Sequence, residues 1–321
     1  MERLISFISL CIMFSILSCA PMDELNYEKI DGINVHNFPI IDGSDSTTPL
    51  RRILAAKLLD FEYEWYRTPI IDDAIRQIYI IPTKERYEEW LLLNNDKLLE
   101  NNTHLSYMNL IDEKVDMILT ARSISRDEKK YAESKSIIMD EKAIAKDALI
   151  FIVHPDNPVQ SLTQEQIRAI YSGVITNWSE VGGFDMNITP YTRNRNSGSQ
   201  EKMETIVMDG ITMIEGTEMT IGQAMMSPYY QVGGDISGIG YTPFYYYDTI
   251  VQNEETKALA IDGIHPTKKT INNRSYPYTT EVYAAIRNDT DISSYTYKLF
   301  EYISTKGGQH IIEDSGYILL N

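Results

Sequence analysis

Two kinds of hydrophobic pattern alternate along this chain and together predict its secondary structure. Short apolar runs bounded by polar residues are typical of buried strands, whereas apolar residues spaced three and four apart are typical of helices that bury one face. Strands are predicted at residues 38–41, 115–119, 148–153, 188–191 and 279–286. Helices are predicted at residues 50–61, 87–93, 164–172, from Gln200 onward, 295–303 and 308–314. This alternation indicates an α/β fold.

A hydroxyl-rich loop follows the first predicted strand. It contains Ser46, Thr47 and Thr48 and leads into the helix that starts near Pro49. Thr48 is expected to cap this helix, with Pro49 at the first helical position, where a missing N–H is not needed. Ser46 and Thr47 then have amide and hydroxyl donors that can point at a ligand. The alternative is an ordinary turn between a strand and a helix.

A second loop of this kind, Arg-Asn-Arg-Asn-Ser-Gly-Ser at residues 193–199, connects the strand at 188–191 to the next helix. The first N–H groups of a helix lack intrahelical partners and carry partial positive charge, so the Ser-Gly-Ser end of this loop suits an anion. Arg193 adds a forked guanidinium donor. Such a run also occurs in ordinary surface turns. Ser106, ahead of a short helical pattern, is a third candidate of the same kind.

The N-terminus has the pattern of an export signal. An apolar run from Leu4 to Leu17 ends in Ser18-Cys19-Ala20 and is too short to span a bilayer comfortably. It resembles a bacterial lipoprotein signal of residues 1–18, with Cys19 lipidated and residues 19–35 forming a tether to the membrane. The alternative is ordinary signal cleavage. The other cysteine, Cys11, would be removed with the signal, which excludes disulfides and thiol catalysis.

Charge and histidine content limit the partners. The net charge of −17 argues against nucleic acid and anionic membrane surfaces. It also opposes an anionic ligand at long range, but salt screens charges beyond about 8 Å, so donors in contact with the ligand outweigh it. The five His residues are scattered without metal-ligand spacing, and no metal or other cofactor is expected.

Several motifs resemble those of the phosphate-binding proteins of bacterial ABC importers. The resemblance covers most of residues 38–318 and is weaker over 63–102. The stretches that carry it are 146–158, 161–163, 170–183 with its Thr-Asn-Trp-Ser-Glu core, 193–199, the Gly-Ile-Gly-Tyr run at 238–241, and the first loop at 43–50.

The resemblance implies a type II periplasmic-binding fold, in which a ligand cleft lies between two α/β lobes joined by a hinge. The first lobe would be discontinuous, formed by residues 36–147 and 279–321, and the second would be residues 148–278. Such a protein is a monomer, exported and anchored by lipid to a bacterial membrane, on its periplasmic side or at the cell surface. It captures phosphate or a similar oxyanion and delivers it to ABC permease subunits.

The resemblance also assigns ligand groups to both lobes. In the first lobe, Ser46 supplies a hydroxyl, Thr47 a backbone donor and Ser106 the hydroxyl of a second helix start. The opposite wall consists of Arg193, Ser197, Gly198 and Ser199, with Ser199 in place of the usual Thr.

One position departs from the family pattern. Members usually carry an acidic residue after the strand that here ends near Leu119, and this residue accepts a proton from hydrogen phosphate. The aligned run is Thr120-Ala121-Arg122-Ser123, and Ala121 cannot accept a hydrogen bond through its side chain. Either Asp45 or Glu201 replaces the acceptor, or the pocket prefers a different or fully ionised oxyanion. Thr120 and Arg122 remain candidate ligand groups; the alternative for Arg122 is a solvated surface residue.

Two rival functions use the same residues. A phosphoryl-transfer or phosphatase-type enzyme also needs hydroxyls, arginine and a buried anion. No Ser-His-Asp order and no P-loop lysine supports it, so no catalytic residue is assigned. The other rival is a sensory or adhesive binding protein that has this fold but no transporter.

Overall fold

The computed structural model describes residues 29–70, 73–194, 197–215, 217–218, 225–252 and 254–320. The predicted signal, Cys19 and most of the predicted tether lie outside these residues. Val35, the last residue of that tether, is buried against the core, so the folded body begins earlier than residue 36. Among the helices described, none has the length and apolar character needed to cross a membrane.

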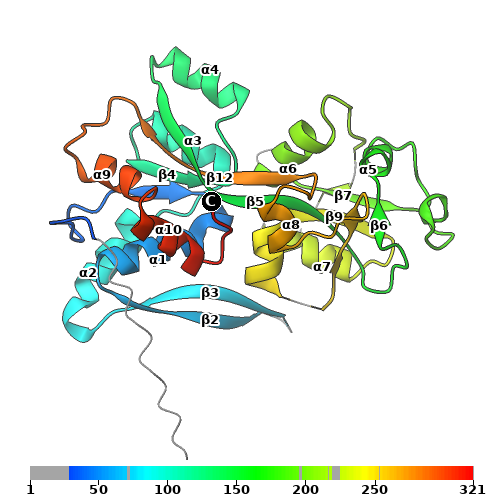
Figure 1. Cartoon of the computed structure of the whole chain (residues 1–321), viewed down its shortest axis with the longest axis horizontal. Coiled ribbons are helices and arrows are strands. Elements are labelled where there is room, and N and C mark those ends of the chain that lie inside the picture. The colour runs from blue at the N-terminus through cyan, green and yellow to red at the C-terminus, as the bar shows by residue number, and fades with distance from the viewer. Residues whose placement is uncertain are drawn as a thin grey trace, which may run out of the picture.

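One mixed sheet runs the length of the molecule (Figure 1). Its strand order is β1-β4-β12-β5-β9-β7-β8, and β10 pairs with the end of β5. The strands are β1 (Ile41–Gly43), β4 (Met117–Thr120), β5 (Met139–Val153), β7 (Thr189–Thr192), β8 (Thr217–Glu218), β9 (Gly238–Pro243), β10 (Lys257–Ala258) and β12 (Thr279–Arg287). The sequence placed the strand before the first loop at residues 38–41, and the structure places it slightly later.

The long strand β5 belongs to both ends of this sheet. From Met139 to Ala148 it pairs with β12, and from Leu149 to Val153 it pairs with β9. The molecule therefore has a first lobe built on β1, β4 and β12 and a second lobe built on β9, β7 and β8. Along β5 the change of partner falls between Ala148 and Leu149. The lobe boundaries expected between residues 147 and 148 and between 278 and 279 remain a proposal.

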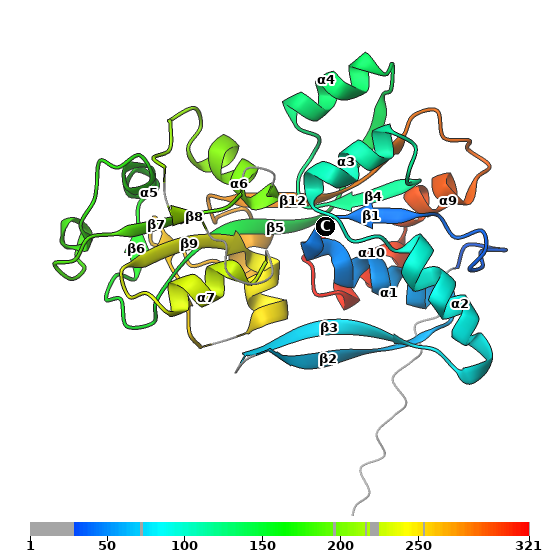
Figure 2. The same cartoon turned by 180° about the vertical axis from the view of Figure 1, so that it is seen from behind.

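Helices cover both faces of each lobe. In the first lobe, α3 and α4 lie on one face and α1 and α10 on the other; in the second, α6 and α7 lie on opposite faces (Figures 1 and 2). The helices are α1 (Thr48–Leu58), α2 (Tyr87–Leu92), α3 (Thr103–Ile111), α4 (Arg126–Ser134), α5 (Gln164–Tyr171), α6 (Gly198–Lys202), α7 (Ser227–Gly233), α8 (Lys268–Asn272), α9 (Tyr295–Tyr302) and α10 (Lys306–Asp314). The predicted two-lobe α/β architecture is confirmed.

Short elements complete the chain. β6 (Ser161–Leu162) pairs in parallel with β11 (Ala260–Ile261). Single turns of other helix types are η1 (Asp45–Thr47), η2 (Lys84–Arg86), η3 (Leu93–Lys97), η4 (Trp178–Val181), η5 (Met203–Val207) and η6 (Tyr246–Val251). Helix η5 continues α6, and η6 follows β9.

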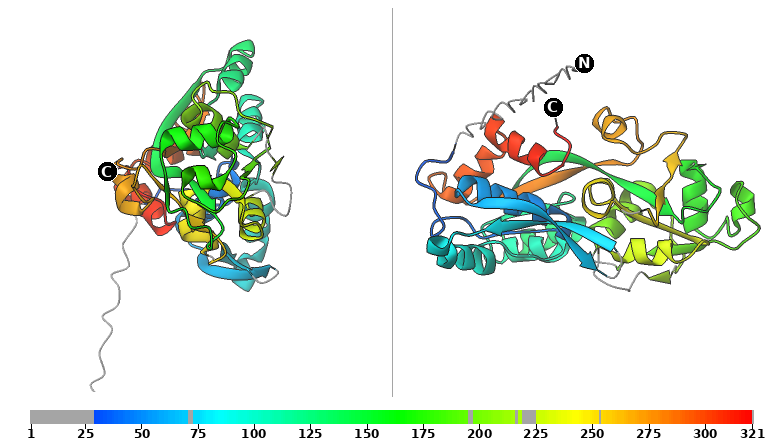
Figure 3. Two further views of the ribbon diagram at one scale, coloured as in Figure 1. Left: turned by 90° about the vertical axis from the view of Figure 1, so that its right-hand side faces the viewer. Right: turned by 90° about the horizontal axis from the view of Figure 1, so that it is seen from below.

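An antiparallel hairpin, β2 (Glu62–Ile70) and β3 (Asp73–Ile81), is absent from the sequence prediction. It packs on α1 and extends below the sheet toward the second lobe (Figures 1 and 3). The Arg76 guanidinium donates to the carbonyl oxygen of Thr249 at 3.4 Å, and the Arg67 guanidinium donates to Oε1 of Gln252 at 3.2 Å. The hairpin thus connects α1 of the first lobe with η6 of the second.

Candidate functional site

A cavity of about 290 Å³ lies between the two lobes, where the first loop and the loop after β7 face each other. We call it the oxyanion cavity. It brings together five of the candidate residues from the sequence. The first lobe contributes Ser44, Asp45, Ser46, Glu100, Asn101, Asn102, Thr103, Leu105 and Ala121, and the rest of the chain contributes Arg193, Asn194, Ser197, Gly198, Ser199, Met225 and Pro243.

Among the described residues that line this cavity, Arg193 is the cation. It directly follows β7, and its backbone N–H donates to Oε1 of Gln200 at 3.0 Å and to the hydroxyl of Tyr241 at 3.1 Å. The residue is only 5% exposed, and Nη1 of its guanidinium has no hydrogen-bond partner. Burial lowers the pKa of Arg193. A buried donor without a hydrogen-bond partner lowers the stability of the fold. An anion that accepts a hydrogen bond from this guanidinium would remove that penalty.

The Ser-Gly-Ser run places small groups beside Arg193. Ser197 caps α6, and its hydroxyl oxygen accepts from the N–H of Ser199 at 3.3 Å. Gly198 packs against the first lobe so closely that an added Cβ would lie 2.7 Å from Oγ1 of Thr103. The two walls of the cavity therefore touch at Gly198 and Thr103, and a side chain at position 198 would force Thr103 to shift.

The first loop is held by a buried arginine that the sequence analysis missed. Nη1 of Arg51 donates to the carbonyl oxygen of Ser44 at 3.0 Å and to Oγ1 of Thr47, and Nη2 donates to Oγ1 of Thr48. Arg51 lies four residues after Thr47 on the first turns of α1, a spacing that places both on one helix face. That spacing is the signal from which it could have been found.

Thr47 does not line the oxyanion cavity. Its N–H donates to the Ser44 carbonyl, and its hydroxyl donates to the carbonyl oxygens of Ser44 and Leu119, both at 2.8 Å. The prediction that Thr48 caps α1 is wrong, because the helix begins at Thr48 and Thr47 is the residue before it. Ser46, which is 2% exposed, is the member of the pair that lines the cavity.

Ser106 and Thr120 also lie away from the cavity lining. Helix α3 begins at Thr103 after the cap Asn102, so the expectation that Ser106 marks a helix start is wrong. The Ser106 hydroxyl donates to the carbonyl of Asn102, the cap of this helix. The Thr120 hydroxyl donates to the carbonyl of Arg122 at 2.9 Å. Thr103, at the true helix start, is the hydroxyl residue that faces Gly198.

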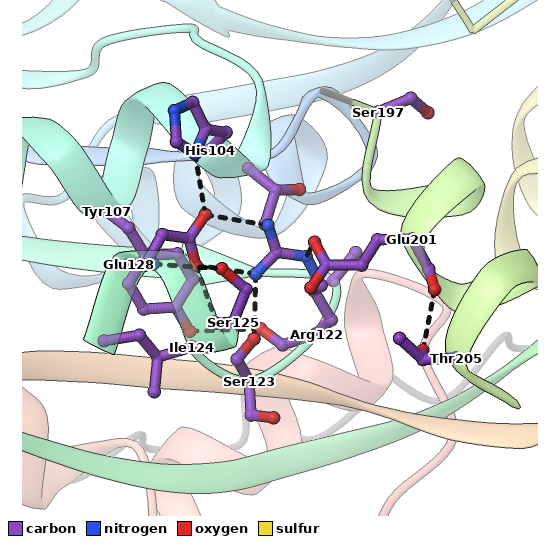
Figure 4. Close-up of polar contacts among 12 residues, drawn as sticks. His104, Tyr107, Arg122, Ser123, Ile124, Ser125, Glu128, Ser197, Glu201 and Thr205 are labelled. Carbon is purple, nitrogen blue, oxygen red and sulfur yellow. Dashed lines mark hydrogen bonds and ion pairs between the residues drawn. The ribbon is translucent and has the colours of Figure 1, made fainter. Parts of the chain in front are cut away.

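Arg122 is buried and ion-paired rather than solvated (Figure 4). Its Nη1 and Nη2 each donate to a carboxylate oxygen of Glu128 at 2.8 Å, and its Nε lies 2.6 Å from Oε2 of Glu201. Burial opposes its charge, but Glu128 and Glu201 raise the pKa of Arg122 above its usual value. Because Glu201 lies on α6, this cluster is an ion-pair contact between the lobes.

Asp45 places a carboxylate in the same cavity as Arg193. Its pKa is raised by burial, although Arg51 and Arg193 act in the opposite direction. Across the residues that the structure describes, no group of three or more His, Cys, Asp or Glu residues is arranged to hold a metal ion. The chemistry available at the site is therefore hydrogen bonding from a guanidinium, hydroxyls and amides, together with the carboxylates of Asp45 and Glu100.

Comparison with known proteins places this geometry in context. The family described as PBP superfamily domain matches residues 95–303, a range that begins after the β2–β3 hairpin. The chain is 24% identical to the phosphate-binding protein PstS of Borreliella burgdorferi, over 71% of this chain and 84% of that protein. It is 29% identical to PstS of Staphylococcus epidermidis, over 72% of this chain and 73% of that protein.

Solved structures show the same fold. A phosphate ABC transporter substrate-binding protein of Clostridium perfringens, determined with bound phosphate, has a TM-score of 0.64 and 23% identity. The match covers 88% of this chain and 98% of that one. An ABC-type phosphate transport receptor of Vibrio cholerae has a TM-score of 0.60 and 21% identity, over 87% and 98% of the two chains.

Proposed function

The chain belongs to the PBP superfamily, and from this membership we propose that it is a solute-binding protein that captures phosphate between its lobes and delivers it to an ABC importer. The relatives named as phosphate-binding proteins support this proposal, and so does the position of the oxyanion cavity. The transporter subunits would recognise the molecule once the lobes have closed on the ligand.

The observation that carries the proposal is the unpartnered guanidinium nitrogen of Arg193. Across the residues that the structure describes, no carboxylate lies within ion-pair distance of Arg193, although the residue is 5% exposed. Burial of an unpaired charge is unfavourable unless something neutralises it. An oxyanion in the cavity would do so with two charge-assisted hydrogen bonds.

The surrounding donors are sufficient for useful affinity. A micromolar dissociation constant corresponds to a binding free energy of about 8 kcal/mol. Each hydrogen bond to a charged group contributes roughly 1.5 to 3 kcal/mol. We propose that Arg193 acts with the hydroxyls of Ser46, Ser197 and Ser199 and the N–H of Gly198. Thr47, Ser106, Thr120 and Arg122 are left out of this set because their polar groups are already bonded within the protein.

Asp45 is the better candidate for the acceptor that is missing at Ala121. It lines the oxyanion cavity, whereas Glu201 is already in an ion pair with Arg122. A carboxylate beside a bound anion is repulsive unless the ligand carries a proton to donate to it. We therefore propose that hydrogen phosphate is preferred to sulfate, which has no proton at neutral pH.

Calorimetric titration with phosphate, sulfate, arsenate and molybdate at pH 8 tests the proposal. We expect phosphate and arsenate to bind and sulfate to bind much more weakly. Lack of phosphate binding by the folded protein would contradict the proposed function. Tight sulfate binding would instead contradict only the role of Asp45.

The enzymatic alternative is tested on the same sample. The relatives are named as binding proteins, and we propose that this chain likewise binds without turnover. Incubation with a phosphomonoester, followed by measurement of free phosphate, should give no product. Release of phosphate that disappears in the Arg193→Ala variant would favour the phosphatase-type enzyme.

We further propose that the mature protein is monomeric and held at the outer side of a bacterial membrane by lipid on Cys19. In cells, the Cys19→Ser variant should leave the membrane fraction, and mass spectrometry of the wild-type N-terminus should show acyl chains. Membrane retention of Cys19→Ser would contradict the lipid anchor. Genes for a permease and an ATPase beside this one would favour the importer over a sensory or adhesive role.

A further inference from the structure

A second cavity, of about 400 Å³, adjoins the oxyanion cavity. We call it the side cavity. Asp45, Glu100 and Met225 line both spaces, so the two cavities meet at these residues. The side cavity is otherwise lined by Thr48, Pro49, Arg52, Arg76, Gln77, Ile78, Tyr246 and Ile250.

The β2–β3 hairpin forms one wall of the side cavity. Arg76, Gln77 and Ile78 come from β3, and Tyr246 and Ile250 come from η6 in the second lobe. The bond from Arg76 to Thr249 joins these two walls. Closure of the lobes on a ligand would therefore change the shape of the side cavity as well as that of the oxyanion cavity.

Arg76 and Arg52 both line this space but differ in their partners. Nη2 of Arg52 is 2.8 Å from Oε1 of Glu100, and its Nη1 donates to the carbonyl of Ile78. Arg76 lies over the ring of Trp65 at 4.6 Å, and within the described parts of the chain no carboxylate pairs with it. Nη1 of Arg76 donates to the carbonyl oxygen of Thr249, and its other N–H groups and the Gln77 side chain are donors in the lining of the side cavity.

The two cavities together exceed the size of one tetrahedral oxyanion. Such an ion displaces roughly the volume of two or three waters, each about 30 Å³. The oxyanion cavity alone is larger than that, and the polar side cavity more than doubles the space. A ligand that used both would have an oxyanion at Arg193 and a polar substituent between Asp45 and Arg76.

We propose that this protein also binds small phosphate monoesters whose substituent carries hydroxyl groups, with the phosphoryl group in the oxyanion cavity and the substituent in the side cavity. The proposal rests on the proposed function, because it uses the same Arg193 site. A hydroxyl of the substituent donates to Asp45 in place of the proton of hydrogen phosphate. Gln77 and Arg76 donate to the remaining substituent oxygens.

Calorimetry with three probes, inorganic phosphate, glycerol 3-phosphate and n-propyl phosphate, tests this inference. We expect wild-type protein to bind glycerol 3-phosphate and to bind n-propyl phosphate, which lacks hydroxyls, about ten-fold more weakly. The Arg76→Ala and Gln77→Ala variants should each lose about ten-fold in affinity for glycerol 3-phosphate and keep their affinity for inorganic phosphate.

Arg67→Ala is the matched control. Arg67 lies directly opposite Arg76 in the hairpin register but does not line the side cavity. This variant should bind all three probes like the wild type, and melting temperatures will show that each variant is folded. Competition between phosphate and glycerol 3-phosphate on the unmodified protein gives a readout that depends on no variant.

The outcomes separate the two proposals. If wild-type protein binds phosphate but not glycerol 3-phosphate, the inference is overturned and the proposed function stands. Equal losses for phosphate and ester in Arg76→Ala would also overturn it. If neither probe binds, the proposed function itself fails.

Discussion

Arg122 and Arg193 are both buried arginines at the junction of the two lobes, but they differ in whether a carboxylate pairs with them. Arg122 is neutralised by Glu128 of its own lobe and by Glu201 of the other. Arg193 has no such carboxylate among the residues described, and Nη1 of its guanidinium has no hydrogen-bond partner. The contrast shows that burial of a cation does not by itself mark a binding site. Arg193 differs in that it has no internal counter-charge and also lines the oxyanion cavity. Buried Arg51 likewise has no ion pair among the described residues, but it donates to Ser44, Thr47 and Thr48.

The Arg193→Ala variant tests this contrast most strongly. We expect phosphate affinity to fall by about 100-fold or more, because two charge-assisted bonds are lost. The melting temperature of the ligand-free protein should be unchanged or slightly higher, because no internal partner of the guanidinium is lost. Calorimetry and thermal denaturation measure the two effects. Arg193→Lys, which keeps the charge without the fork, should be intermediate; retained affinity in Arg193→Ala would reject the assignment.

The Glu128→Gln variant probes the paired arginine. Removing one partner of a buried ion pair should lower the free energy of unfolding by about 3 kcal/mol, while phosphate affinity stays near that of the wild type. Burial opposes ionisation of Glu128, but Arg122 lowers its pKa below the ordinary value of 4.5. Because the pKa of Glu128 is lower in the folded state, its ionised carboxylate stabilises the protein at pH values above the ordinary pKa. This stabilisation is lost as the pH falls through the lowered pKa.

Urea denaturation at several pH values measures this effect. The difference in the free energy of unfolding between wild type and Glu128→Gln should be largest near about pH 7. It should shrink as the pH falls below about 4.5. A large loss of phosphate affinity with unchanged stability would reverse the roles that we assign to the two arginines.

The Gly198→Ala variant acts on the contact between the two walls. Because the added methyl group would meet Oγ1 of Thr103 at 2.7 Å, the lobes could not close fully, and we expect phosphate affinity to fall by about ten-fold. The double variant with Thr103→Ala removes the clash. Affinity measurements on both single variants and the double variant form a cycle, and additive losses would show that the contact is unimportant.

The Asp45→Asn variant should change the selectivity between oxyanions. We expect the preference for phosphate over sulfate to fall by about ten-fold at pH 8, since the amide can donate to a fully ionised oxyanion. Because burial raises the pKa of Asp45 in the fold, the ionised carboxylate destabilises the ligand-free protein. The variant should therefore be more stable than wild type at high pH, and this gain should vanish below the unfolded-state value of 3.8.

Glu100→Gln provides the matched control for Asp45→Asn. Glu100 lines the same cavity but is paired with Arg52. The ratio of phosphate to sulfate affinity should not change in this variant. If Asp45→Asn prefers phosphate to sulfate as strongly as wild type does, a group other than Asp45 selects the protonated ligand.

Local patterns in the sequence predicted much of the secondary structure. The helix predicted at 164–172 appears as α5, which begins after a capping box formed by Thr163 and Gln166. The strand at 279–286 appears as β12. The hairpin was missed because its strands are joined at Ile70-Ile71-Asp72-Asp73, which lacks the Asn-Gly or Asp-Gly signal of a tight turn.

The sequence alone determined the α/β alternation, the hydroxyl-rich loops and the choice of Arg193, because strand period, helix capping and turn chemistry act between near neighbours. Only the tertiary structure decided which polar groups remain free in the cavity. Thr47 and Ser46 are adjacent and similar, yet Thr47 is bonded to Leu119 across the sheet while Ser46 lines the site. Arg122 is matched by Glu201 from the other lobe. Such pairings depend on residues far apart in the chain, and no local pattern encodes them.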